Sequence, residues 1–143
     1  MTTLTLQNPP ASTNLSHERT RRSPARTFAL WLLQIAAAAI FLTAGLSKLA
    51  GATAMVQMFD AVGVGQWFRY VTGSIEVAGA LMLLVPGLAS FGALALAVVM
   101  LGAIGTHLFV IGGNPSIPVV LLAATAYVAW TRSAERRTQR TRR

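Results

Sequence analysis

Three ionisable side chains lie inside long apolar runs of the chain: Lys48, Glu76 and His107. A charged group at mid-helix depth in a bilayer costs about 2.5–3.5 kcal/mol on insertion scales, so such groups normally face the protein interior, find partners and serve function. A carboxylate, an ammonium and an imidazole together can bind a polar ligand or pass protons. We therefore take these three residues as the candidate polar cluster.

The numbers of cysteine, histidine and acidic residues limit the kinds of catalytic or metal site that the chain can form. The chain has no cysteine, so it has no thiolate nucleophile, disulfide or thiolate metal ligand. It has two histidines and four acidic residues, and a metal site would have to rely on His107 and Glu76 with little else. We expect no metal site and no catalytic constellation, and hence a protein that is not an enzyme on its own.

Composition indicates a membrane protein. Of the 143 residues 54% are hydrophobic and 11% are charged, against about 45–50% and about 25% in soluble domains. The net charge of +8 comes from arginines at the two ends of the chain. Only Lys48 and Arg69 lie between these clusters, so the charge indicates topology and lipid contact rather than a nucleic-acid surface.

The apolar runs predict an all-α polytopic membrane protein with four transmembrane helices. Residues 1–26 are polar and read as a disordered basic arm, residues 27–131 as the transmembrane domain, and residues 132–143 as a basic tail. The predicted spans cover about 28–49, 68–88, 90–111 and 115–131.

Three local features bear on these spans. The first run could be a signal peptide, but it exceeds the usual apolar region of about 7–15 residues. Ala52–Val62 is either a short interfacial helix or a packed loop cap. The last run, Ile117–Trp130, is short for a span and needs tilted neighbours or a locally thin bilayer.

Charge bias predicts the topology. If both arginine clusters stay in the cytoplasm, the number of crossings is even, and four spans satisfy this. The protein would then be a multi-pass inner-membrane protein with cytoplasmic termini. Lys48, Glu76 and His107 would all fall in the outer half of the bundle, on helix faces of small residues. Four polar residues are candidates to support the cluster: Gln34, Arg69, Thr72 and Asn114.

Each of these residues also has a structural interpretation. Glu76 is either an ion-pair partner that locks the bundle, a ligand or proton site, or a protonated carboxyl with no role. Lys48 either extends to water or pairs with Glu76. His107 is either a satisfied bundle histidine or a donor to a quinone carbonyl, and we expect Arg69 to be an interfacial arginine.

Three segments resemble the DoxX and DoxX-like membrane proteins in order and spacing. They are FLTAGLSKLAG over 41–51, GSIEVAGALMLLVPG over 73–87 and AVVMLGAIGTHL over 97–108. The resemblance covers about residues 28–130 and implies a four-helix inner-membrane protein. Some relatives are linked to thiosulfate:quinone oxidoreductase or to membrane oxidoreductase complexes that handle thiols and oxidative stress.

This resemblance implies an accessory or quinone-associated subunit of a membrane redox system, with quinone as the candidate cofactor. The alternatives are a non-enzymatic scaffold or assembly factor, and a small transporter or proton pathway. The expected partners are membrane lipids and either a redox protein or further copies of the chain.

Overall fold

The computed structural model describes the backbone of residues 24–140 and the side chains of residues 24–134. Within that range every regular element is a helix. Most of the predicted arm, residues 1–23, and the last three residues of the predicted tail lie outside the described residues. The elements are α1 (Pro24–Leu49), α2 (Thr53–Val62), α3 (Gln66–Leu84), α4 (Ala89–Thr106), the π-helical turn η1 (His107–Ile111) and α5 (Ser116–Arg140).

The helix boundaries follow local chemistry. α3 ends at Leu84, four residues before the predicted boundary, because Pro86 disfavours helical geometry at the residue before it. Of the two alternatives for Ala52–Val62, the structure shows the short helix, as α2. It ends at Val62, and the following Gly63 has a φ of 75°, in the left-handed region that glycine adopts without strain.

The last helix is longer than predicted. α5 begins at Ser116, where the Asn114 side chain accepts a hydrogen bond from the Ser116 backbone N–H at 3.0 Å. It then continues without interruption to Arg140, because residues 132–140 are mostly good helix formers. The first nine residues of the predicted tail are therefore helical.

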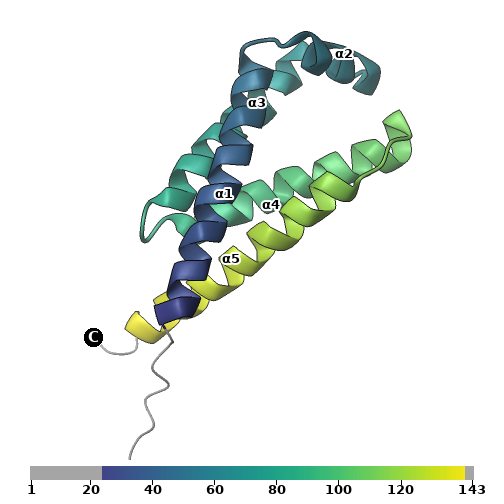
Figure 1. The fold of residues 1–143 in the computed structure, drawn as a ribbon. Coiled ribbons are helices and arrows are strands. Elements are labelled where there is room, and N and C mark those ends of the chain that lie inside the picture. Colours follow the sequence, from purple (N-terminus) through teal and green to yellow (C-terminus); the bar gives the residue numbers. More distant parts are fainter. Residues whose placement is uncertain (1–23, 141–143) are drawn as a thin grey trace, which may run out of the picture.

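The helices form two hairpins that meet at one end (Figure 1). α1 packs along α3, and α4 packs along α5. The closed end of the molecule is the end where α1 begins and α5 finishes. The open end is the opposite end, where α2 packs against η1. α3 and α4 cross in close contact at Gly79 and Gly92, where a Cβ on Gly92 would lie 2.6 Å from the Gly79 carbonyl oxygen. Helices that cross at an angle separate beyond their contact point, so the hairpins diverge toward the open end.

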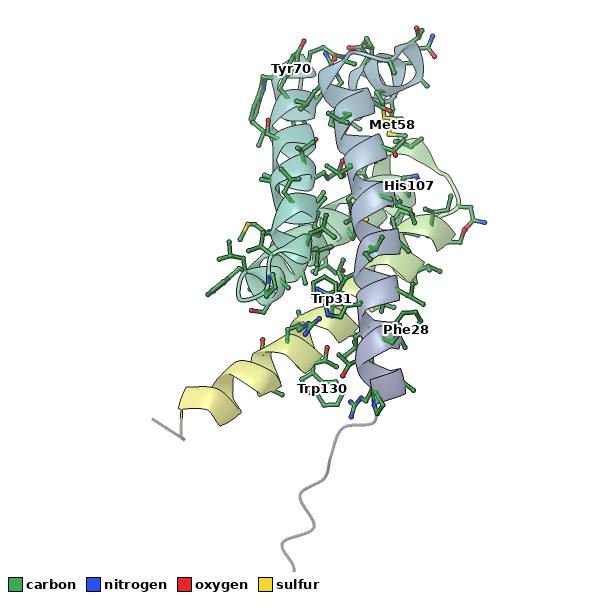
Figure 2. The ribbon with its side chains drawn as sticks, turned by 60° about the vertical axis from the view of Figure 1, so that its left-hand side comes forward. Phe28, Trp31, Met58, Tyr70, His107 and Trp130 are labelled. Carbon is green, nitrogen blue, oxygen red and sulfur yellow. The ribbon has the colours of Figure 1, made fainter. Side chains whose placement is uncertain are left out.

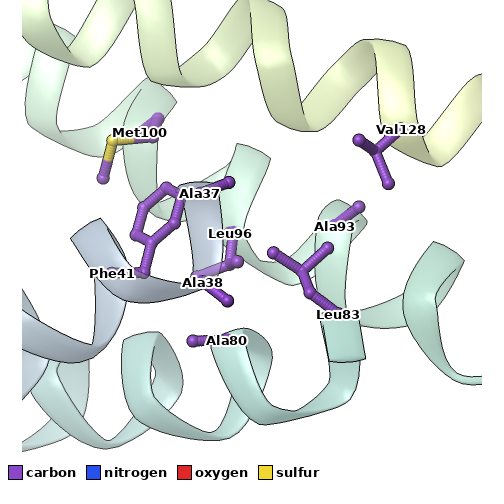
Figure 3. Packing of buried hydrophobic residues seen from close by; sticks show 9 residues of the cluster. All are labelled: Ala37, Ala38, Phe41, Ala80, Leu83, Ala93, Leu96, Met100 and Val128. Carbon is purple, nitrogen blue, oxygen red and sulfur yellow. The ribbon is translucent and has the colours of Figure 1, made fainter. Parts of the chain in front are cut away.

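The apolar core lies where the two hairpins meet (Figure 3). Small residues of α1, α3 and α4 allow the helices to approach, and a few larger side chains fill the space between them. The buried cluster consists of Ala37, Ala38, Phe41, Ala80, Leu83, Ala93, Leu96, Met100 and Val128.

Three helical segments are long and apolar enough to cross a membrane, namely Pro24–Leu49, Ala89–Ile111 and Ser116–Ala134. The last of these includes the run that looked short in the sequence. α3 has 19 residues but is not among them, because polar side chains that include Arg69 and Glu76 lower its hydropathy. The all-α prediction is therefore confirmed for the described residues, whereas three candidate spans are found there and the predicted four are not confirmed.

Candidate functional site: a buried polar junction between α1 and α3

Lys48 and Glu76 form an ion pair between α1 and α3. The Lys48 Nζ lies 2.6 Å from the Glu76 Oε2, and the two side chains are 13% and 2% exposed. Of the two interpretations of Lys48 from the sequence, pairing with Glu76 is the one that the geometry shows. A carboxylate that is buried among apolar helices is tolerated because its partner cation is present.

Glycines bring the two helix backbones together beneath this pair. A Cβ on Gly45 of α1 would lie 2.9 Å from the Gly73 carbonyl oxygen of α3. A Cβ on Gly73 would lie 3.0 Å from the Lys48 Cβ. The close approach allows Lys48 to reach Glu76 across the interface, and any larger residue at either glycine would push the helices apart.

Arg69 adds a second link between the helices. Its Nη1 donates to the Lys48 carbonyl oxygen in the last turn of α1, and its Nε donates to the Gln66 Oε1 at 2.7 Å. The carbonyl end of a helix carries partial negative charge, so a cation there is stabilised. The sequence predicted an interfacial arginine, but Arg69 is 4% exposed because its guanidinium turns inward to cap α1.

Gln66, which the sequence analysis did not single out, connects this junction to α2. Its Nε2 donates to the Val56 carbonyl oxygen at 3.0 Å and to the Asp60 Oδ1 at 2.6 Å. Gln66 thus ties α2 to the start of α3. No sequence pattern identified it, because a glutamine at a helix start has several common roles.

His107 lies apart from the junction. Its Nδ1 contacts the Ala103 carbonyl oxygen at 2.8 Å, one turn earlier in α4. No hydrogen bond or ion pair joins His107 to Lys48 or Glu76 in the described part of the chain. The prediction assumed that all helices run side by side, whereas the hairpins diverge toward the open end and place His107 on the other hairpin.

Gln34 belongs to a different polar contact, at the closed end. It is 1% exposed, its Nε2 donates to the Leu83 carbonyl oxygen at 2.7 Å, and its Oε1 accepts from the Arg132 Nε at 3.1 Å and from the Arg132 Nη2. Along α1, Gln34 lies about 21 Å from Lys48. The Arg132 Cζ also lies 5.5 Å from the centre of the Trp31 ring. Arg132 was predicted to lie in the tail, and it instead joins α5 to α1.

Two other predicted supporting residues satisfy only local backbone. The Thr72 hydroxyl donates within its own helix to the carbonyl oxygens of Phe68 and Arg69, at 2.9 Å and 3.1 Å. Asn114 caps α5, as described above. Among the residues with described side chains, no group of three or more His, Cys, Asp or Glu residues gathers as a metal site would require.

The arrangement limits the junction to holding the helices together and donating a hydrogen bond. The Lys48–Glu76 pair is neutral as a whole, and the pair, Arg69 and Gln66 hold one another by hydrogen bonds. An ammonium has three hydrogens, so Lys48 can donate to a further acceptor while it remains bound to Glu76. The junction can fix two helices and present one cationic donor.

Comparison with known proteins identifies the family. Searches of curated proteins and of solved structures give no significant match. The family model described as the DoxX-like family matches residues 32–130. The match includes the Lys48–Glu76 junction and Gln34, but not Arg132. The chain is a membrane protein that belongs to the DoxX-like family.

Proposed function

We propose that this protein crosses the inner membrane four times, with α3 as the fourth span and both termini in the cytoplasm. Arg69 and Glu76 are bonded within the protein, so α3 does not present these two charges unpaired to lipid. α1 begins and α5 ends at the same end of the molecule, as an even number of crossings requires (Figure 1). The arginine clusters favour the cytoplasmic side for that end.

We propose that the protein acts as a non-catalytic accessory or scaffold protein, in which the junction of Lys48, Glu76, Arg69 and Gln66 fixes the outer end of α1 against α3. The observation that carries this proposal is the direct contact of 2.6 Å between two largely buried charged groups. The loss of one partner of a buried ion pair leaves an uncompensated charge, so we infer that the Lys48–Glu76 pair favours the observed packing of α1 on α3.

The test is a double-mutant cycle on the ion pair. Lys48→Met and Glu76→Gln should each destabilise the protein by about 3 kcal/mol, and the double variant should recover a large part of that loss. The measurement is unfolding of the purified protein in mixed micelles. Asp60→Asn is the matched control, because Asp60 is an exposed acid whose amide replacement keeps the acceptor for Gln66. If the losses of stability from the two single changes simply add in the double variant, Lys48 and Glu76 do not interact, and the proposed role of their pair is contradicted.

A second candidate is a quinone-associated subunit of a membrane redox system. The observation that favours it is the difference in exposure within the pair, because the Lys48 side chain is 13% exposed and Glu76 is 2% exposed. Lys48 could donate a hydrogen bond to a quinone carbonyl while Glu76 keeps its ammonium charged. His107 takes no part in this version, because it lies on the other hairpin.

Quinone binding separates the two candidates. If Lys48 is the donor, the wild-type protein binds a short-chain quinone and Lys48→Met weakens that binding about tenfold, while Asp60→Asn leaves it unchanged. A folded wild-type protein that binds no quinone would exclude the second candidate and leave the first intact. Copurification in mild detergent would show whether a redox protein or a second copy is the partner.

A further inference from the structure

We propose that Trp67 and Tyr70 form an aromatic anchor that contacts the lipid headgroup region at the open end, and that α2 lies in water beyond this anchor. The anchor would fix the level of the membrane surface relative to the helices. It is independent of the role proposed for the Lys48–Glu76 pair and of the number of crossings.

The anchor consists of two exposed rings in the first turns of α3. Trp67 and Tyr70 are 61% and 49% exposed. The Trp67 Nε1 donates to the Val64 carbonyl oxygen at 3.1 Å, and the Arg69 Cζ lies 4.3 Å from the centre of the Tyr70 ring. Aromatic side chains with one polar end favour the border between hydrocarbon and water. The protein thus holds two rings of this kind on its outside.

The level of the anchor follows from α1, which is a candidate span. The bond from Arg69 to the Lys48 carbonyl oxygen places the start of α3 beside the end of α1. At about 1.5 Å per residue, the helix from the exposed Phe28 to Lys48 is about 30 Å long. The hydrocarbon core of a bilayer is also about 30 Å thick. A hydrocarbon layer that begins at Phe28 therefore ends at the level of the anchor.

The exposed side chains change in type at both borders of this layer. Among the described residues, the exposed tryptophans and tyrosines are Trp67 and Tyr70 of α3 and Tyr127 and Trp130 of α5. Figure 2 shows Tyr70 at the open end, and Phe28 and Trp130 at the closed end. Between these levels the large exposed apolar side chains of α1 and α3 are all aliphatic. Aromatic belts on either side of an aliphatic zone are typical of proteins that cross a bilayer.

α2 has a different surface, which favours water over lipid. Its large apolar side chains are all buried or half-buried, and the Phe59 ring makes an edge contact with the Phe68 ring of α3 at 6.0 Å between centres. An interfacial helix would instead leave a large apolar face for lipid. The exposed residues of α2 are all small or polar, namely Thr53, Ala54, Gln57, Asp60 and Ala61.

Fluorescence quenching tests the depth of the anchor. The full chain with Trp31→Phe and Trp130→Phe keeps Trp67 as its single tryptophan. It is placed in phosphatidylcholine nanodiscs whose lipid chains carry bromine either close to the headgroup or close to the chain end. We expect the shallow bromine to cause the larger loss of Trp67 fluorescence. Val98→Trp, with all three native tryptophans replaced by phenylalanine, is the depth control. Val98 is exposed near the middle of the span Ala89–Ile111, so the deep bromine should cause the larger loss there.

A second probe reports on α2. Gln57→Trp, again with the native tryptophans replaced, lies on the exposed face of α2. We expect iodide in the water to quench it and neither brominated lipid to do so. Quenching of this probe by the shallow bromine would contradict the position of α2 in water and make it an interfacial helix.

The anchor is contradicted if the deep bromine quenches Trp67 more than the shallow one. It is also contradicted if neither bromine nor iodide reaches Trp67, because a protein would then cover the ring. Thermal unfolding checks that each variant folds. If the phenylalanine changes prevent folding, Trp67→Cys in the otherwise native chain supplies the test, because the chain has no other cysteine. A nitroxide attached there should be relaxed by oxygen dissolved in lipid and by a nickel complex in water, as a group at the border would be. A failed mutant cycle at Lys48 and Glu76 would leave these results unchanged, because quenching reports depth rather than stability.

Discussion

The two halves of α4 with η1 have similar composition and opposite surroundings. In residues 89–100, seven residues are buried, and Gly92 contacts the backbone of α3. In residues 101–111 none is buried, and a Cβ on Gly102 or Gly105 would meet nothing within 4 Å. The difference shows that hydropathy predicts which segment can cross a membrane, whereas the crossing angle of α3 and α4 decides which half of that segment packs within the protein.

Of Gly92→Ala, Gln34→Leu and Gly102→Ala, the first should have the largest effect, because it adds a methyl group to the packed half. In Gly92→Ala the new Cβ would lie 2.6 Å from the Gly79 carbonyl oxygen and 3.1 Å from the Leu83 backbone nitrogen, neither of which can move aside alone. We expect a loss of about 1–3 kcal/mol in the free energy of unfolding. Thermal unfolding in a single detergent would measure it, and unchanged stability would mean that the two hairpins do not cross at this point.

A smaller effect should follow from removal of the polar contact at the closed end. Gln34→Leu deprives the Leu83 carbonyl oxygen and Arg132 of a partner, and we expect a loss of about 1–2 kcal/mol. Gln57→Leu on the exposed surface of α2 is the control. If both leucine variants unfold at the same temperature, Gln34 does not hold the closed end together.

The smallest effect should come from the open half of α4. Gly102→Ala adds a methyl group where no atom lies within 4 Å, and alanine favours a helix over glycine by about 0.5–1 kcal/mol. We expect equal or slightly higher stability in the same unfolding assay. A clear loss would show that another molecule packs closely on this face, which would make the two halves of α4 alike.

Much of the fold could be predicted from the sequence. The long apolar runs predicted the helices, Pro86 and Gly87 predicted the turn between α3 and α4, and the pattern of residues 52–62 predicted α2 as one of two alternatives. The continuation of α5 to Arg140 was not predicted, because residues 132–140 have no apolar face to pack on a neighbouring helix, although most of them favour a helix locally. The divergence of the hairpins depends on the angle at which α3 and α4 cross near Gly79 and Gly92, and helical periodicity does not encode this angle.

The candidate site was predicted in part. Glu76 had to find a partner because a lone charge among apolar residues is costly, and the helical faces made Lys48 a candidate. Arg69 was assigned to the interface because arginines at helix starts usually reach water, and nothing local in the sequence indicates the Lys48 carbonyl oxygen as its acceptor. His107 was placed near Glu76 from depth alone. Depth does not fix lateral position, and the structure places His107 on the other hairpin.

The bond from Arg69 to the Lys48 carbonyl oxygen bears on how the protein is made. α1 precedes α3 in the chain, and the Lys48 ammonium obtains its carboxylate partner from α3. The Lys48 carbonyl oxygen accepts from the nearby Gly51 N–H and also from Arg69 of α3. Until the ribosome has produced the chain as far as Glu76, the Lys48 ammonium lacks its carboxylate partner. α1 can therefore reach the state seen in the structure only together with α3, so the α1–α3 hairpin, rather than the single helix, is the smallest unit in which the Lys48 charge is paired.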